Sequence, residues 1–470
     1  MGNDTLSFLD AGFLETEDSD RHASLTIGAL AVIEGPPPDQ KEFRDAVAER
    51  LLDLPHARDK LRTAPLDVSA PSWTEDSNFD LDRHLRRVAI PNPGEEEALF
   101  GFVARVMGHR LDRDHPLWEC WVVEGLSGDR WAMLAKLHHC MADGITGTRL
   151  FEAMCDEVEP TIDPAADSSG PDRPAHQPPP APSISTLLSP SHQCELLETI
   201  LRAPLTIARA GLGAGRGLAR LLTEMLTSSS DTSLIGPIGK QRRYRGARTR
   251  MADVREICAA YGVTVNDVAL AAITGGLRTL LLRRGEHPDA HTVRTLVPVS
   301  ARSANDDAES LHNQVSLMLP FLPVDIEDHV EQLTAVHRRM SAHKAGKEAQ
   351  GGKVFTTLAQ SGPFMPLAWA LRLATRFPQH SVVAVATNIP GPQQTRHLLS
   401  RRIVDIFPYV PIALRLRVGI AILSYADNLT FGLTGDYDTT PDLADLGTAI
   451  EQGVSSLLTA ARLETAGSQS

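Results

Sequence analysis

Two adjacent histidines, His138 and His139, end an apolar stretch of the chain, and Asp143 and Gly144 follow. If residues 131–139 form a strand, the alternation of side chains directs the two rings to opposite faces, so one enters a cleft and the other packs inward. An imidazole titrates near neutrality and can take a proton from a hydroxyl group, which suits a general base. The Asp-Gly pair is typical of a turn, and its carboxylate can hold an arginine or an imidazole that fixes the loop. The residues alone allow two interpretations: one histidine is a general base, or both histidines are structural.

A metal site is disfavoured at this motif. Adjacent histidines on a strand diverge, and no second group of His, Cys or Glu has the spacing of metal ligands. The five cysteines form an odd set without a CxxC pair, which indicates neither a disulfide framework nor a zinc site and favours a reducing compartment. The net charge of −13 disfavours a nucleic-acid-binding protein.

Other polar residues have two interpretations each. Asn266 and Asp267 stand at the start of a helical pattern, where asparagine is a good N-cap; either capping explains the pair or the two side chains line a channel. Arg302 either pairs with Asp143 or is a surface cation in a loop. The basic run KQRRYRGARTR at 240–250 is expected to be a solvated connection, with contact to phosphate groups or an anionic membrane surface as the alternative.

The elements that must position these residues alternate along the chain. Strands, marked by β-branched and aromatic residues, are expected at 22–34, 118–124, 131–139, 293–300, 313–323, 381–388, 417–426 and 429–437. Helices, marked by amphipathic spacing, are expected at 41–53, 96–112, 251–260 and 264–285, and another at the segment that starts with Gly147. The mixture lacks the strict βα repeat of a barrel and therefore predicts a mixed α/β (α+β) fold.

A chain of 470 residues is too long for one compact core, so two domains are expected. The proline-rich segment 160–184 is predicted to be an exposed linker. It separates an N-terminal domain, 1–159, from a helical crossover at 185–240 and a C-terminal domain at 241–470.

The motif HHCMADG at 138–144 resembles the active-site motif of the CoA-dependent acyltransferase superfamily. Further segments narrow the resemblance to the bacterial wax ester synthase/diacylglycerol acyltransferase family, in the family's order and over nearly the whole chain. These segments are LSFLDAGFLETE (6–17), FDLDRHLRRVAIPNPG (79–94), LDRDHPLWECWVVEGL (111–126), VTVNDVALAAITGGLR (263–278), PVSAR (298–302), NQVSLMLPFLPV (313–324) and TNIPGP (387–392).

The resemblance implies two chloramphenicol-acetyltransferase-like domains with an active-site tunnel between them. It also implies an O-acyltransferase in which His139 is the general base for a lipid hydroxyl that attacks the thioester of acyl-CoA. By the same resemblance His138 supports the strand end, Asp143 orients the loop, and Gly144 leaves room for the substrate arm.

The resemblance further implies the substrates and their binding residues. The candidate substrate-binding residues are Pro116, Leu117, Trp118, Asn266, Asp267 and Arg302, with Trp118 also readable as a core aromatic residue. Acyl-CoA is a substrate, and no cofactor or metal is expected. The acceptor is expected to be diacylglycerol, giving triacylglycerol, with a fatty alcohol giving a wax ester as the variant. We expect a cytoplasmic protein with peripheral contact to membranes or lipid droplets and without a spanning helix.

Two other functions stay open at this point. The first is a condensation-type acyltransferase that uses another alcohol or an amine, which the Pro116–Trp118 and Asn266-Asp267 segments disfavour. The second is a catalytically silent lipid-binding paralogue, which the intact HHCMADG motif disfavours, because a binding protein needs no base.

Limited proteolysis tests the predicted linker. The first cuts are expected within 160–184, because a segment rich in proline and poor in large apolar residues contributes little to either core. The two fragments should stay associated and active, since the site needs both domains. First cuts elsewhere, or fragments that separate under native conditions, contradict the proposed layout.

Overall fold

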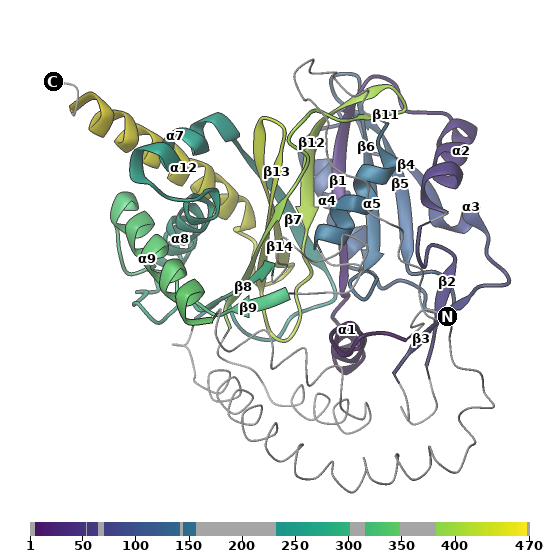
Figure 1. Cartoon of the computed structure of the whole chain (residues 1–470), viewed down its shortest axis with the longest axis horizontal. Helices are drawn as coiled ribbons and strands as arrows, with labels where there is room; N and C mark the ends of the chain where they lie inside the picture. Colours follow the sequence, from purple (N-terminus) through teal and green to yellow (C-terminus); the bar gives the residue numbers. More distant parts are fainter. Residues whose placement is uncertain are drawn as a thin grey trace, which may run out of the picture. The chain divides into compact units, whose positions relative to one another are not determined.

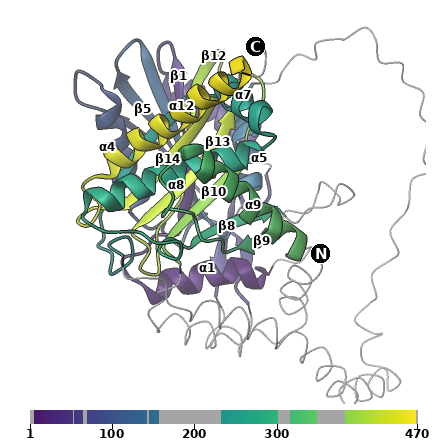
Figure 2. The ribbon, with the colours of Figure 1, turned by 90° about the vertical axis from the view of Figure 1, so that its left-hand side faces the viewer.

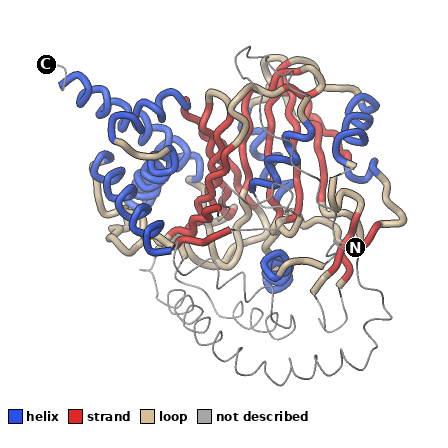
Figure 3. The backbone as a smooth tube through the Cα atoms, in the orientation of Figure 1, coloured by secondary structure: helices blue, strands red, loops and turns tan. Residues whose placement is uncertain are grey.

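The computed structural model describes residues 5–52, 54–63, 70–141, 144–156, 232–300, 315–347 and 382–467. They belong to one compact unit that joins residues 1–156 with 223–470, whereas residues 157–222 make up a second unit outside the described residues. The first unit combines two six-stranded sheets, a two-stranded sheet and helices (Figures 1 and 3). The predicted mixed α/β fold is therefore confirmed. The linker at 160–184 lies outside the described residues, and the domain boundaries stay predictions.

The first sheet has the strand order β11-β12-β1-β6-β5-β4, and its pairs are antiparallel except for β4 with β5. Trp131 and Met133 face one core of this sheet and Ala132 and Leu134 face the other, so both faces are covered. Its strands are β1 (Thr26–Glu34), β4 (Leu85–Ala89), β5 (Trp118–Leu126), β6 (Arg130–His138), β11 (His397–Leu398) and β12 (Arg401–Tyr409). Two of the six strands thus come from the C-terminal part of the chain.

Helices cover both faces of the first sheet. Residues of α4 (Glu96–Met107) belong to the core on one face, and residues of α2 (Gln40–Leu51), α3 (Leu81–His84) and α5 (Gly144–Met154) belong to the core on the other. A small hairpin of β2 (Asp59–Arg62) and β3 (Ser72–Glu75) and the N-terminal helix α1 (Phe8–Ser19) complete this part of the chain.

The second sheet has the order β7-β14-β13-β10-β8-β9. Its strands are β7 (Arg242–Arg250), β8 (Thr295–Ser300), β9 (Val315–Met318), β10 (Ala384–Pro390), β13 (Val418–Tyr425) and β14 (Asn428–Asp436). Figure 2 shows helices laid across one face of it, and their apolar residues form a single core with the strands. These helices are α7 (Met251–Tyr261), α8 (Val265–Arg283), α9 (His329–Lys347) and α12 (Leu443–Gly467).

The two sheets meet where β12 crosses β14 and β7. Thr430 of β14 donates a hydrogen bond to the Ile406 carbonyl (2.6 Å), and the Tyr244 hydroxyl donates to the Pro408 carbonyl (2.8 Å). At Gly432 the backbones approach so closely that a Cβ atom would lie 1.6 Å from the Pro408 oxygen. Only glycine fits this crossing.

The basic run at 240–250 is not a solvated connection, and that expectation was wrong. It forms β7, which pairs with β14 over its whole length. Arg248 donates to Asp405 (2.9 Å) and to both carboxylate oxygens of Glu96, and Arg242 is buried. The run contains no acid, so Arg248 is paired with carboxylates distant in the sequence, while Arg242 and Arg243 donate to backbone carbonyls. The sequence analysis also made no prediction for α1, β12, α9 or α12.

Gly432→Ala tests the crossing of the sheets. We expect it to lower the free energy of unfolding by about 3 kcal/mol, because the added methyl group must displace backbone. Thermal and chemical denaturation measure the effect. Gly101→Ala is the matched control, since a Cβ at Gly101 would lie 3.7 Å from its nearest neighbour and alanine favours the helix by up to about 1 kcal/mol. Equal stability of the two variants would contradict the interpretation.

Candidate active site

The N-terminal helix α1 supplies the partners of both motif histidines. Ser7 caps its first turn by accepting a hydrogen bond from the Asp10 N–H (3.1 Å). Phe13 and Glu17 are four residues apart and therefore lie on the same face of the helix. The Phe13 ring stacks on His139, with centroids 3.9 Å apart and planes at 14°, and a Glu17 carboxylate oxygen lies 3.6 Å from Nε2 of His138.

His138 is a buried ring with both nitrogens facing protein groups. Only 1% of the residue is exposed. Nδ1 accepts a hydrogen bond from the Cys140 N–H (3.1 Å), so this nitrogen carries no proton. The proton of the neutral ring is then on Nε2, which points to the carboxylate of Glu17. Nδ1 of His138 is therefore occupied, whereas Nε2 faces the Glu17 carboxylate at 3.6 Å without a hydrogen bond.

Glu17 is a buried carboxylate with three partners. One oxygen accepts the Leu25 N–H (2.9 Å), and the other accepts a hydrogen bond from Arg113 (2.7 Å) and faces His138. Burial alone would raise the pKa of Glu17, but the interaction with His138 and the hydrogen bonds from Leu25 and Arg113 outweigh it and lower the pKa to about 2. Glu17 is therefore ionised at neutral pH.

His139 follows the last residue of β6 and is partly exposed, unlike its neighbour. Its N–H donates to the Leu25 carbonyl (2.9 Å), which fixes the backbone next to the start of β1. Phe13, the ring stacked on it, packs in an apolar cluster with Ala413 and Leu414 from the segment before β13. The ring that stacks on His139 thus packs in one cluster with residues from the C-terminal part of the chain.

The residues at 116–118 are placed in the core beside the motif. Leu117 is fully buried in a cluster with Leu14 of α1 and with Cys140, and its carbonyl accepts the His138 N–H (3.0 Å). Trp118 donates its indole N–H to the Ala57 carbonyl (2.7 Å) and stacks on a neighbouring histidine ring. The Pro116 carbonyl accepts the Trp118 N–H (2.9 Å). Their part in substrate binding stays a prediction.

The structure assigns different roles to Asn266 and Asp267. The N-cap of α8 is Thr264, so the expectation that Asn266 caps the helix was wrong. Asp267 completes a capping box with Thr264 and also lies 2.8 Å from Nδ1 of His337 on α9. Asn266 instead accepts a hydrogen bond from Asn388 of β10 (3.2 Å).

That contact joins two of the sequence segments singled out above, 263–278 and 387–392. Ile389, which follows Asn388, packs against the same core cluster as Met141 of the histidine motif. Strand β10 therefore shares a core with Met141 and contacts α5, the helix that begins at Gly144. Gly144 is the first residue of α5, whereas Asp143 and Arg302 lie outside the described residues, and their predicted pairing stays a prediction.

Sequence reasoning missed Phe13, Glu17, Arg113, Asn388 and His337 as parts of this constellation. The signal for the first two was present, since Phe13 and Glu17 have the spacing of one helical turn within the segment 6–17. Nothing local in the sequence marks the other three as partners.

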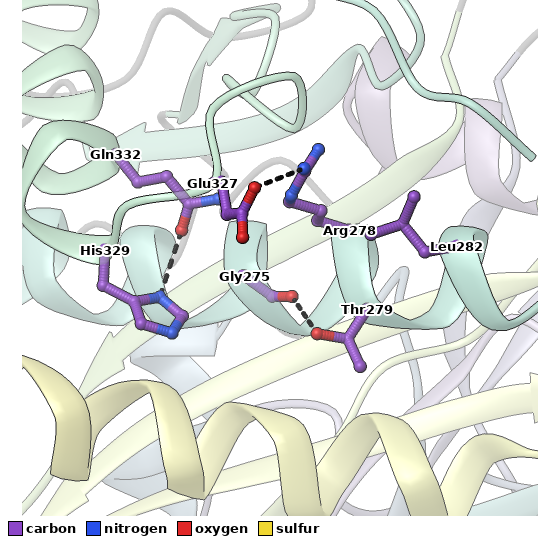
Figure 4. A pocket seen from close by; sticks show the side chains of 7 residues that line it. All are labelled: Gly275, Arg278, Thr279, Leu282, Glu327, His329 and Gln332. Carbon is purple, nitrogen blue, oxygen red and sulfur yellow. Dashed lines mark hydrogen bonds and ion pairs between the residues drawn. The ribbon is translucent and has the colours of Figure 1, made fainter.

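A separate surface pocket of about 390 Å³ lies between α8 and the start of α9 (Figure 4). Its lining includes Arg278, His329 and Gln332 but none of the candidate residues named from the sequence. Arg278 donates to the Val324 carbonyl (2.8 Å), and Gln332 donates to the Ile326 carbonyl (2.7 Å). These side chains fix the connection before α9. The pocket belongs to the helices that cover the second sheet, whereas the histidine motif is at the end of β6 in the first sheet.

Family models and known proteins match nearly the whole chain. The model of the wax ester synthase/diacylglycerol acyltransferase catalytic domain matches residues 6–269, and that of the WS/DGAT C-terminal domain matches residues 311–457. A probable diacylglycerol O-acyltransferase of Mycobacterium tuberculosis is 45% identical over 453 residues, which cover 96% of this chain and 95% of that protein. A second, putative diacylglycerol O-acyltransferase of the same species is 36% identical over 453 residues, covering 96% and 90%.

Solved structures show the same fold. The wax ester synthase/diacylglycerol acyltransferase from Marinobacter aquaeolei VT8 aligns with a TM-score of 0.67 and 26% identity, covering 98% of this chain and all of that one. The first condensation domain of the calcium-dependent antibiotic synthetase aligns with a TM-score of 0.58 and 14% identity, covering 97% and 95%. At that identity the second match shows a shared fold alone.

The Glu17 carboxylate makes a pH-dependent prediction. Its folded-state pKa of about 2 lies below the ordinary 4.5, so its ionisation adds stability that is fully present above pH 4.5 and is lost as the pH falls toward 2. The shift corresponds to on the order of 3 kcal/mol. Glu17→Gln should therefore destabilise the protein strongly at pH 7, and the difference from wild type should narrow below pH 4.5.

Chemical denaturation from pH 7 to pH 3 measures this difference. Glu49→Gln is the control, because Glu49 is exposed on α2 and the substitution removes the same charge. A difference between wild type and Glu17→Gln that stays constant with pH would contradict a depressed pKa.

Proposed function

The chain belongs to the wax ester synthase/diacylglycerol acyltransferase family, and from that premise we propose that it esterifies diacylglycerol with the acyl group of acyl-CoA, using His139 as the general base. Family membership makes the protein an acyl-CoA-dependent O-acyltransferase that produces triacylglycerols or wax esters. Diacylglycerol is the favoured acceptor because the 45%-identical relative is named as a diacylglycerol O-acyltransferase.

The different environments of the two motif histidines support the choice of His139. Nδ1 of His138 already accepts a hydrogen bond, Nε2 faces Glu17, and the ring is buried. A base must be able to take up a proton from a bound substrate, which requires access. His139 is less buried than His138, and the hydrogen bond from its N–H to the Leu25 carbonyl fixes its backbone; Nδ1 of the ring is buried, so we propose that Nε2 takes the proton.

In the proposed reaction the acceptor hydroxyl transfers its proton to His139 as the oxygen attacks the thioester carbonyl. The tetrahedral intermediate then breaks its C–S bond, giving the ester and CoA thiolate, and protonated His139 returns its proton to the thiolate. No acyl-enzyme is formed in this sequence. Cys140, although adjacent to His139, is buried, and burial raises the pKa of its thiol well above the ordinary value, which disfavours a thiolate nucleophile.

Contacts within the protein hold the base in place for this step. Phe13 stacks on the His139 ring and restricts its rotation, and the Glu17–His138 contact anchors the strand end from which His139 projects. Asp143 and Gly144 are proposed, by family resemblance, to shape the following loop. Asn266 and Asn388 are proposed to line the acceptor side, since they join the two segments that reach the motif from the second sheet.

We also propose that the protein is cytoplasmic and contacts a membrane or lipid-droplet surface transiently, because its acceptor is a lipid. Among the described residues one helix, α8, is long and apolar enough to cross a bilayer, and 72% of that stretch is buried by protein. Its burial under α9 and α12 is typical of a core helix.

His139→Ala tests the base. Turnover should fall on the order of 10²- to 10⁴-fold, the usual contribution of general acid–base catalysis, while acyl-CoA binding is largely retained. Release of free CoA from palmitoyl-CoA with diacylglycerol measures turnover. His287→Ala is the control, since His287 is exposed on another part of the chain. A folded His139→Ala protein with near wild-type turnover would contradict the mechanism.

The acceptor is tested with the same donor against diacylglycerol, monoacylglycerol, hexadecanol and a long-chain amine. Triacylglycerol is expected to be the dominant product on chromatography. A preference for the amine would favour the condensation-type alternative, and acyl-CoA binding without turnover on any acceptor would favour a silent binding protein.

A further inference from the structure

The segment between β12 and β13 holds two consecutive non-glycine residues in the left-handed conformation. Leu414 and Arg415 have φ values of 52° and 70°, a region that residues with a Cβ seldom adopt. The surrounding backbone enforces it, because Gly236 donates its N–H to the Arg415 carbonyl (2.9 Å) and Arg417 donates to the Leu234 carbonyl (3.1 Å). Conformations of this cost persist where the fold over-determines them, and they cluster at functional sites.

The backbone of Arg415 is fixed, but its side chain lacks hydrogen-bond partners among the described residues. Its Nε atom is inaccessible to solvent and has no hydrogen-bond partner, and its guanidinium forms no ion pair with any carboxylate among the described residues. A buried donor without a partner costs free energy, so each such group in a folded protein calls for an explanation. Arg417, two residues on, is satisfied instead by the carbonyls of Ser233 (2.9 Å) and Pro237 (3.4 Å).

Positive charge is in excess around this segment. Burial lowers the pKa of Arg417, and the charges of Arg415 and Arg284 lower it further against the opposing effect of Asp436. The acidic groups nearby already have partners. Asp436 accepts the Gly239 N–H (2.6 Å), and Asp442 is paired with Arg284 (2.5 Å). An anion that enters here therefore meets an unpaired guanidinium in a positive field.

This segment shares an apolar cluster with the ring that stacks on the proposed base. Leu414, which precedes Arg415, packs in one apolar cluster with Phe13, and Phe13 stacks on His139. Arg415 follows Leu414 directly in the chain, so it is linked to the site through Leu414 and Phe13 and does not itself stack on the imidazole. A substrate whose anionic group is joined to the reacting carbonyl by a flexible arm could place the carbonyl at His139 and the anionic group at Arg415.

We propose that Arg415 binds a phosphate group of the acyl-CoA donor. The inference rests on the proposed function and adds the residue that recognises the donor. Diacylglycerol and fatty alcohols are neutral, so the phosphates of CoA are the anionic groups that the two substrates bring. The planar guanidinium presents several N–H donors in a fork that matches phosphate oxygens, which lysine does not.

Titration calorimetry of the full-length protein with CoA tests the proposal. Arg415→Gln should weaken CoA binding about 10- to 100-fold at low salt, because charge-assisted hydrogen bonds to phosphate are lost. Glutamine also has a Cβ atom, so the backbone strain at position 415 is unchanged.

The thermal midpoint should not fall, since Arg415 donates no hydrogen bond to a described residue. Arg415→Lys should recover only part of the affinity. Arg255→Gln, at an exposed arginine of α7, is the control for loss of charge and should bind CoA as wild type does.

Dephospho-CoA identifies which phosphate is bound. If Arg415 contacts the 3′-phosphate, dephospho-CoA binds wild type and Arg415→Gln equally weakly; if it contacts the diphosphate, the substitution weakens both ligands to the same extent. In the acyl transfer assay KM for palmitoyl-CoA should rise by the same factor, with kcat at saturation retained.

CoA affinity that is unchanged in Arg415→Gln overturns the site and leaves the proposed function standing. A wild-type protein that transfers acyl groups from CoA but shows equal loss of affinity in Arg415→Gln and Arg255→Gln also overturns it, since the effect is then one of net charge. A wild-type protein that does not bind CoA overturns the site and the proposed function together.

Discussion

The buried carboxylate of Glu17 is the interaction on which the arrangement around the histidine motif depends. A carboxylate with a side chain only 1% exposed must find compensating groups inside the protein. Those groups are the Leu25 N–H at the start of β1, the Arg113 guanidinium before β5 and the His138 ring at the end of β6. Because one charge requires all three, three chain segments meet at α1, and the position of His139 follows from theirs.

A second charge cluster, built around the buried carboxylate of Asp405, joins the two sheets at the middle of β12. Arg248 of β7 bridges Glu96 at the start of α4 and Asp405 of β12, and Asn428 of β14 donates to the same Asp405 (2.8 Å). Burial raises the pKa of Asp405 even though Arg248 and Asn428 oppose that shift. These contacts and the close approach at Gly432 hold the N-terminal and C-terminal parts of the chain together.

This interlocking gives the two motif histidines different surroundings. His138 is buried with Nε2 facing Glu17, and the ring of His139 stacks on Phe13. The segment before β13 joins the same apolar cluster as Phe13 through Leu414, and it carries Arg415, which forms no ion pair with any described residue. The proposed base and the proposed phosphate-binding residue therefore come from different halves of the chain.

The sequence by itself determined the reactive motif, the mixed α/β class, most helices and strands, and the family. Those features are local, since side-chain periodicity and motif spacing are set by neighbours along the chain. It did not show that the basic run at 240–250 is a strand, or that Asn266 pairs with Asn388 rather than capping α8. Arg248 and Asp405 are 157 residues apart, and Asn266 and Asn388 are 122 apart. Pairs at such separations leave no periodic signal, because only the packing of the two sheets brings them within hydrogen-bonding distance.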